Sequence, residues 1–159
     1  MASLAISALQ KAVKMCHQRF VYTIAETPDD RLAWSPGGNA PSPLQVAGKL
    51  AGFMHVLAYY TRTGEFPPRP SSPPPSPDSR EAVAAALDAG YEALQSTLSG
   101  LSDEDLVRRV PAPTGTLVDA GVMVALIPTV LGYFQGQLNA VQMAYGDMRP
   151  NVPENWGSD

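Results

Sequence analysis

The fold is decided by LVDAGVMVALIPTVLGYFQGQLNAVQMAY, residues 117–145. Its apolar residues recur at intervals of three and four, which places them along one side of a helix. They are Ala120, Val124, Ile127, Leu131, Phe134, Leu138, Val141 and Tyr145. The pattern predicts one helix over 117–145, about 43 Å long if straight at 1.5 Å per residue. Pro128 removes a backbone hydrogen bond within it, so we expect a kink there.

Three further segments have the same helical periodicity. The first covers residues 2–26 and ends where Pro28 removes an amide donor. The second covers residues 43–63, with Ser42 as its N-cap and Gly64 as its stop. The third is expected between the capping pair of Asp78 and Glu81 and Gly100. A short acidic turn of helix, capped by Ser102 and Asp105, follows to about Arg109.

Seven prolines stand between Thr63 and Pro77, at 67, 68, 70, 73, 74, 75 and 77. This density forbids helix and favours an extended, polyproline-type connection between the second and third helices. A ligand for an SH3-type domain would have the same composition. With no strand pattern elsewhere, residues 1–159 are predicted to form a single all-α domain, a four-helix bundle. Periodicity alone leaves its topology open.

Composition excludes several functional classes. The 159 residues carry a net charge of −4, and the eleven basic residues are scattered, so we expect no nucleic-acid surface. A single cysteine, Cys16, excludes an internal disulfide framework and a multi-cysteine zinc site. The longest apolar run, residues 121–134, contains a proline and is shorter than the roughly 20 residues that span a bilayer. We therefore expect a cytoplasmic protein without a membrane partner.

Few residues offer catalytic chemistry. Neither His17 nor His55 has a second histidine or a carboxylate at i+3 or i+4, so we interpret Cys16 as a core thiol and His17 as a surface imidazole. Lys49 is the exception, because its neighbours at helical spacing are apolar. Its amine either extends to the edge of the bundle or, if enclosed, is a candidate base, nucleophile or anion clamp.

Three stretches together resemble the DinB-like, or YfiT-like, superfamily of bacterial four-helix bundles. They are residues 27–34 with Pro36 and Gly37, residues 42–47, and residues 136–138 followed by 144–146. The resemblance covers nearly the whole chain and implies an up-down-down-up bundle. It also implies, for metal-binding members, three histidines on the second and fourth helices with an open position for a divalent metal, and thiol-transfer chemistry in some members.

The positions of those three histidines fall on Lys49, Val130 and Phe134. Valine and phenylalanine cannot coordinate a cation, and an ammonium repels one. The resemblance therefore predicts that this chain has no metal and no cofactor. In place of the metal site we expect packed side chains or a small pocket bounded by Lys49, Val130, Phe134 and Gln137.

Three functional hypotheses follow. The first is a metal-free bundle that binds a small molecule or assembles with other chains, and is not an enzyme. The second is a transferase or hydrolase of the DinB/YfiT type, dependent on a metal at a displaced site or assisted by Lys49. The third is an interaction module that joins copies of itself through helix faces, or offers the proline-rich connection to a partner. A homodimer is expected under the first and third.

Overall fold

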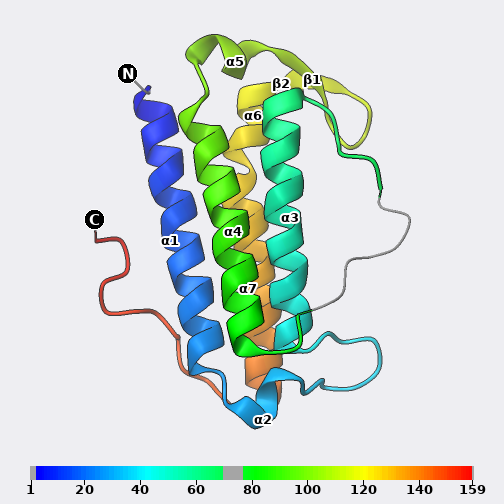
Figure 1. Ribbon diagram of the computed structural model, residues 1–159, viewed down its shortest axis with the longest axis vertical. Coiled ribbons are helices and arrows are strands. Elements are labelled where there is room, and N and C mark those ends of the chain that lie inside the picture. The colour runs from blue at the N-terminus through cyan, green and yellow to red at the C-terminus, as the bar shows by residue number, and fades with distance from the viewer. Residues whose placement is uncertain (1–2, 70–76, 159) are drawn as a thin grey trace.

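The computed structural model describes residues 3–69 and 77–158. Four long helices form a bundle: α1 (Leu4–Glu26), α3 (Pro43–Thr63), α4 (Arg80–Ser99) and α7 (Ile127–Ala144) (Figure 1). α1 and α3 each pack against both α4 and α7, so α4 and α7 occupy diagonally opposite corners. The predicted stripes supply the core, including Phe20, Leu50, Leu94 and Leu138, each at most 2% exposed. The four-helix bundle is confirmed.

The topology is up-down-down-up. α1 and α7 run in one direction, and α3 and α4 both run in the other (Figure 1). The connection between α3 and α4 must therefore return along the length of the bundle, which explains why it is long. The predicted extended conformation of residues 70–76 lies outside the described residues. Pro77, at the end of the connection, packs so closely on Gly48 that a Cβ there would lie 2.7 Å from its Cδ.

The helix ends follow the expected capping chemistry with one correction. Ser42 and Gln45 form a capping box at the start of α3, and Gly64 ends that helix with a φ of 79°. Ser102 and Asp105 likewise cap α5 (Asp103–Val107). The prediction that Asp78 caps α4 is wrong, because Ser79 accepts the hydrogen bond from the Ala82 amide. Asp78 stands one residue too early to reach it.

The single helix predicted over residues 117–145 is divided. β1 (Arg109–Pro111) pairs antiparallel with β2 (Leu117–Asp119), and only then does α6 (Ala120–Ala125) begin. Gly115, with a φ of 82°, provides the turn between the strands. The helix breaks at Leu126 and resumes as α7, with Pro128 in its first turn, so the kink is confirmed as a complete break. The all-α description holds apart from this hairpin.

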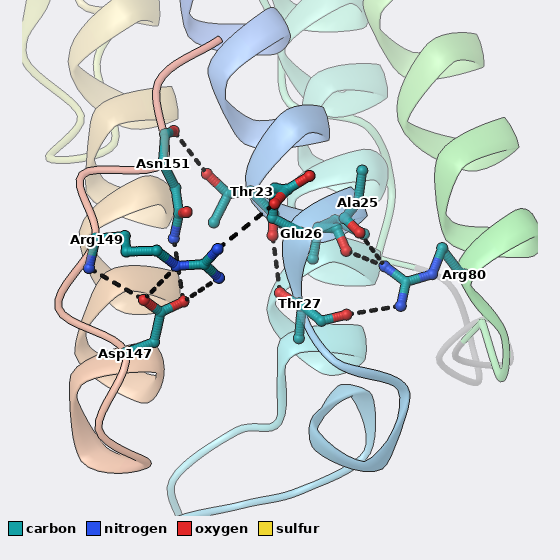
Figure 2. A network of polar contacts seen from close by, with 9 residues as sticks. Thr23, Ala25, Glu26, Thr27, Arg80, Asp147, Arg149 and Asn151 are labelled. Atoms are coloured by element: carbon teal, nitrogen blue, oxygen red, sulfur yellow. Dashed lines mark hydrogen bonds and ion pairs between the residues drawn. The ribbon is translucent and has the colours of Figure 1, made fainter.

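A short segment closes the end of the bundle at which α1 ends (Figure 1). After α1 the chain forms a short helix, α2 (Asp29–Leu32). The guanidinium of Arg80 spans this junction and donates to the carbonyl oxygens of Ala25 and Thr27 (Figure 2). It also donates to the carbonyl oxygen of Ile24 and pairs with Asp29. The Ile24 carbonyl oxygen also accepts from the Thr27 amide at the end of the helix. Arg80, from the neighbouring α4, thus adds a second cap to the end of α1.

The chain after α7 returns along α1 (Figure 1). Asp147 accepts hydrogen bonds from the backbone amide and guanidinium of Arg149, which also pairs with Glu26 of α1 (Figure 2). Farther along, the Trp156 indole donates to the carbonyl oxygen of Met15 at 2.8 Å. Between these contacts, Arg19 and Thr23 of α1 donate to the carbonyl oxygens of Pro150 and Asn151, at 3.4 and 3.5 Å. Several polar contacts thus hold this segment, residues 147–158, against α1.

Candidate functional site

The predicted pocket residues lie on two facing helices. Lys49 is on α3, and Val130, Phe134 and Gln137 are on α7. The three α7 side chains are half-buried, whereas Lys49 is exposed. Phe134 meets α3 through Phe53, one turn beyond Lys49, with 6.0 Å between the two ring centroids. An aromatic contact therefore joins the two helices in this region.

This arrangement offers little to a metal or to acid–base chemistry. Within residues 3–69 and 77–158, no three histidine, cysteine, aspartate or glutamate side chains lie together as a metal site requires. Lys49 is not enclosed, so it lacks the burial that would make its amine a base or nucleophile. Cavities of about 270–370 Å³ lie elsewhere in the molecule and are lined by other residues.

His17 is buried, so its interpretation as a surface imidazole is wrong. Only 9% of the residue is exposed, and its ring stacks on Tyr91 of α4 with 4.2 Å between centroids. Its Nε2 lies 3.1 Å from a carboxylate oxygen of Asp88, while the buried Nδ1 has no hydrogen-bond partner among the described residues. Burial lowers the pKa of His17, and the hydrogen bond and charge of Asp88 oppose this only in part. The pair joins α1 to α4.

Cys16 behaves as the predicted core thiol. It is half-buried, packs against the main core and directs its Sγ towards the Pro128 carbonyl oxygen, 4.0 Å away. Burial raises the pKa of the thiol above 9.0, and the charge of Arg19 offsets this effect only in part. A thiol that keeps its proton is a poor nucleophile, so the position favours packing over chemistry.

A polar contact within the α1–α7 interface was not foreseen from the sequence. The amide nitrogen of Gln135 donates to the Thr23 hydroxyl at 3.2 Å and to the Asn139 side chain at 2.8 Å. Gln135 is buried, and its amide oxygen has no partner within the described residues. These polar side chains lie beside the apolar stripe of α7. The spacing of apolar residues therefore did not predict them.

A second stripe runs along the outer side of α6 and α7. The exposed side chains recur at intervals of four and three residues and include no charge. They are Val122, Leu126, Thr129, Tyr133, Gly136, Ala140 and Met143. The four large apolar ones are 45% to 62% exposed. We call these seven residues the outer stripe. A regular apolar repeat on an exposed helix surface indicates a packing surface.

The same segment has the composition of a membrane span. Among the described residues, the stretch Ala120–Ala144 is long and apolar enough to cross a bilayer, although core helices of soluble proteins also meet this criterion. Only 33% of its most apolar part is buried inside the bundle. The buried part consists of residues on the side of α6 and α7 that faces the core, such as Val124, Leu131 and Leu138. The outer stripe contributes to the remainder.

Comparison with known proteins now gives the family. The model of the DinB superfamily matches residues 12–129, most of the chain. The chain belongs to the DinB superfamily. Among solved structures, the DinB-like protein YjoA from Bacillus subtilis has a TM-score of 0.65 at 13% identity, over 95% of this chain and 96% of that one. No curated protein matches the chain significantly.

DinB superfamily membership confirms the resemblance predicted from residues 27–34, 42–47, 136–138 and 144–146. At 13% identity, the likeness to YjoA extends to the fold, including the four-helix arrangement, and to no activity. Because the family alone gives no reaction, the function of this DinB-superfamily chain has to be argued from its own surfaces.

Proposed function

We propose that this DinB-superfamily chain is a metal-free interaction bundle that pairs with a second copy of itself through the outer stripe of α6 and α7. The single observation that carries the proposal is the regular, uncharged and exposed spacing of that stripe. The absence of a histidine at Lys49, Val130 and Phe134, where the family resemblance places metal ligands, supports a role without metal chemistry.

A second copy is favoured because the stripe complements itself. When two copies of α7 lie antiparallel about a two-fold axis, each stripe position faces a stripe position of the other copy. The facing pairs are Leu126 with Met143, Thr129 with Ala140, and Tyr133 with Gly136. The ring of Tyr133 then lies over a glycine, which lets the two backbones approach closely. Every pair occurs twice, as a two-fold interface requires.

The absence of charge on the outer stripe also favours pairing with a second copy. No Asp, Glu, Lys or Arg occurs between Asp119 and Asp147, so the surface offers nothing to select an oppositely charged partner. One helix pair is smaller than the roughly 800 Å² per partner of a standard interface. We therefore expect a reversible dimer with a micromolar dissociation constant.

Sedimentation velocity over a concentration series tests the proposal. Gly136→Glu places a carboxylate under the facing Tyr133 and should give a monomer throughout. Gly52→Glu is the matched control, because both glycines are exposed in mid-helix with nothing within 4 Å of an added Cβ. It should associate like the unchanged chain. A mixture of Tyr133→Glu with Gly136→Lys should recover association, because the new charges face each other only in this register.

The same experiment can overturn the proposal. An unchanged chain that is monomeric at every concentration would contradict it, as would equal loss of association in Gly136→Glu and Gly52→Glu. Flotation with phosphatidylcholine vesicles addresses the membrane-like composition of Ala120–Ala144. Flotation of the unchanged chain that Gly136→Glu abolishes would assign the outer stripe to a lipid surface and refute pairing.

A further inference from the structure

A groove lies between α3 and α4, at the end of the bundle that carries α5. It consists of two adjoining hollows of about 360 and 330 Å³ that share Arg62, Ser96 and Thr97. The groove exists because the facing positions Ala58 and Ala93 are too small to fill the space between the helices. Its volume is in the range of small-molecule sites. α4 is diagonally opposite α7, so this feature is independent of the outer stripe.

Two guanidinium groups define the charge of the groove. Arg62 lies over the Tyr59 ring, 5.8 Å from its centroid, and takes part in none of the ion pairs that the described residues form. The Arg108 guanidinium donates to the carbonyl oxygens of Thr61 and Arg62, at the long distances of 3.4 and 3.5 Å, and forms no ion pair within 4 Å among the described residues. Both cations thus retain donors for a ligand.

The lining contains one carboxylate, that of Asp105, and it already accepts hydrogen bonds within the protein. Asp105 accepts hydrogen bonds from the backbone amide and the hydroxyl of Ser102 at 2.9 and 2.7 Å. These bonds, together with the charge of Arg108, lower the pKa of Asp105, which therefore stays ionised. Two arginines against one carboxylate leave the groove positive in a chain whose net charge is −4.

Several of the remaining polar side chains can donate a hydrogen bond to an anion as well as accept one. His55, Tyr59 and Arg62 follow one another at intervals of four and three residues, which puts them on one wall of the groove. Ser96 contributes a hydroxyl from the opposite wall. The Tyr59 ring adds a planar apolar surface. Donors, positive charge and an aromatic ring together complement an anion with a flat organic portion.

We propose that this groove binds a small organic acid, a molecule that carries a carboxylate or a phosphate. The acid group would lie between Arg62 and Arg108, where a guanidinium can donate two parallel hydrogen bonds to it. The organic portion would lie over Ala58 and Ala93, against Tyr59. This assigns to α3 and α4 a binding site that is separate from pairing through α7.

Titration of the full chain, followed by amide chemical shifts, tests the site. Phenyl phosphate and benzoate represent the two acid groups, inorganic phosphate the acid group alone, and benzyl alcohol the ring without charge. Phenyl phosphate, benzoate or both should bind saturably, with shifts concentrated at Thr97, Gly100 and Leu101. The tighter binder of phenyl phosphate and benzoate shows whether the site prefers a phosphate or a carboxylate. Benzyl alcohol should not bind.

Two variants separate charge from shape. Arg62→Gln should weaken binding by about tenfold or more, the usual scale for losing a charge-assisted contact. Arg69→Gln, the same change at an exposed arginine outside the groove, is the matched control. Ala93→Leu fills the floor and should weaken phenyl phosphate or benzoate more than inorganic phosphate. Thermal denaturation confirms that each variant is folded.

Three results would overturn the inference: neither acid binds saturably, Arg62→Gln and Arg69→Gln weaken binding equally, or benzyl alcohol binds as tightly as benzoate. The last result would make the groove an apolar site rather than an anion site. Loss of self-association in Gly136→Glu would not affect these titrations, so the two proposals fail separately.

Discussion

The imidazole of His17 is held between α1 and α4 in a setting that keeps it uncharged. Asp88 forms a hydrogen bond with Nε2, but in the part of the chain that the structure describes a proton on Nδ1 would be buried without an acceptor. A helical wheel places His17 about 100° from Cys16, outside the apolar stripe. That reasoning failed because α1 packs against both α4 and α7 and so buries two sides. One stripe of apolar residues reports only one of these contacts.

This environment makes the stability of the fold depend on pH. The pKa of His17 is below its usual 6.5 in the folded chain, so the unfolded chain takes up the proton first as the pH falls. Stability is therefore fully present above pH 6.5 and decreases as the pH falls from there towards the folded pKa. Urea denaturation at pH 7.5 and 5.5 should show this loss.

The matched variants are His17→Phe and His55→Phe. His17→Phe keeps a ring against Tyr91 but cannot titrate, so its loss of stability between pH 7.5 and 5.5 should be smaller than in the unchanged chain. His55 is exposed, and His55→Phe should retain the full pH dependence. If the two variants respond to pH identically, burial of His17 is not the cause.

Among the elements, α3 and α4 show why helix positions were easier to predict than their ends and contacts. Their apolar stripes and the Ser42 cap depend on residues that are close together in the sequence, so the sequence alone predicts them. The close approach of the two helices depends on Gly90, whose added Cβ would lie 2.8 Å from the Ala51 carbonyl oxygen. Glycine within a helical pattern predicts no partner by itself. The strand at Leu117–Asp119 was missed for the same reason, because it forms only by pairing with β1.

We expect Gly90→Ala to destabilise the protein, although alanine is the better helix former by about 1 kcal/mol. The Cβ would force α3 and α4 apart, at a net cost of about 1–3 kcal/mol. Gly52→Ala is the control, because it adds the same methyl group in mid-helix to open space. It should stabilise by about 0.5–1 kcal/mol. Chemical denaturation measures both. Equal effects of the two substitutions would show that helix contact at Gly90 is not tight.

At the scale of the whole molecule, the bundle topology was predictable and the surfaces were not. Family resemblance supplied the up-down-down-up order, and the long connection permitted it. The predicted site joined Lys49 to α7, yet the lysine is exposed and Phe53, a neighbour on α3, makes the contact with Phe134. Rotation of each helix about its axis decides such contacts, and sequence spacing alone does not fix the rotation of two helices relative to each other.

The segment that returns along α1 gives a prediction at this scale. Asp147 organises it by accepting bonds from Arg149 and Asn151, and the bonds from Arg149 lower the pKa of this carboxyl from 3.8 to about 2. The contact is thus complete above pH 3.8 and is lost as the pH falls towards 2. Asp147→Ala should release the segment at neutral pH, at a cost of about 1 kcal/mol in global stability.

Trp156 reports this release. In a Trp34→Phe background it is the only tryptophan, and acrylamide should quench its fluorescence more strongly once Asp147 is replaced. Glu26→Gln changes the more distant carboxylate partner of Arg149, 3.6 Å away, and should have little effect. Unchanged quenching in Asp147→Ala would mean that the contacts of Pro150, Asn151 and Trp156 with α1 hold the segment without Asp147.

The position of α6 and α7 after the other three long helices has a consequence during synthesis. When this segment leaves the ribosome, α1, α3 and α4 have already emerged, and α1 and α3 carry the surface that receives its buried apolar residues. Among the described residues this segment is the one with the composition of a membrane span, and Pro128 and the buried Gln135 interrupt its apolar sequence. The order of translation therefore gives this segment a protein surface to fold against as soon as it appears.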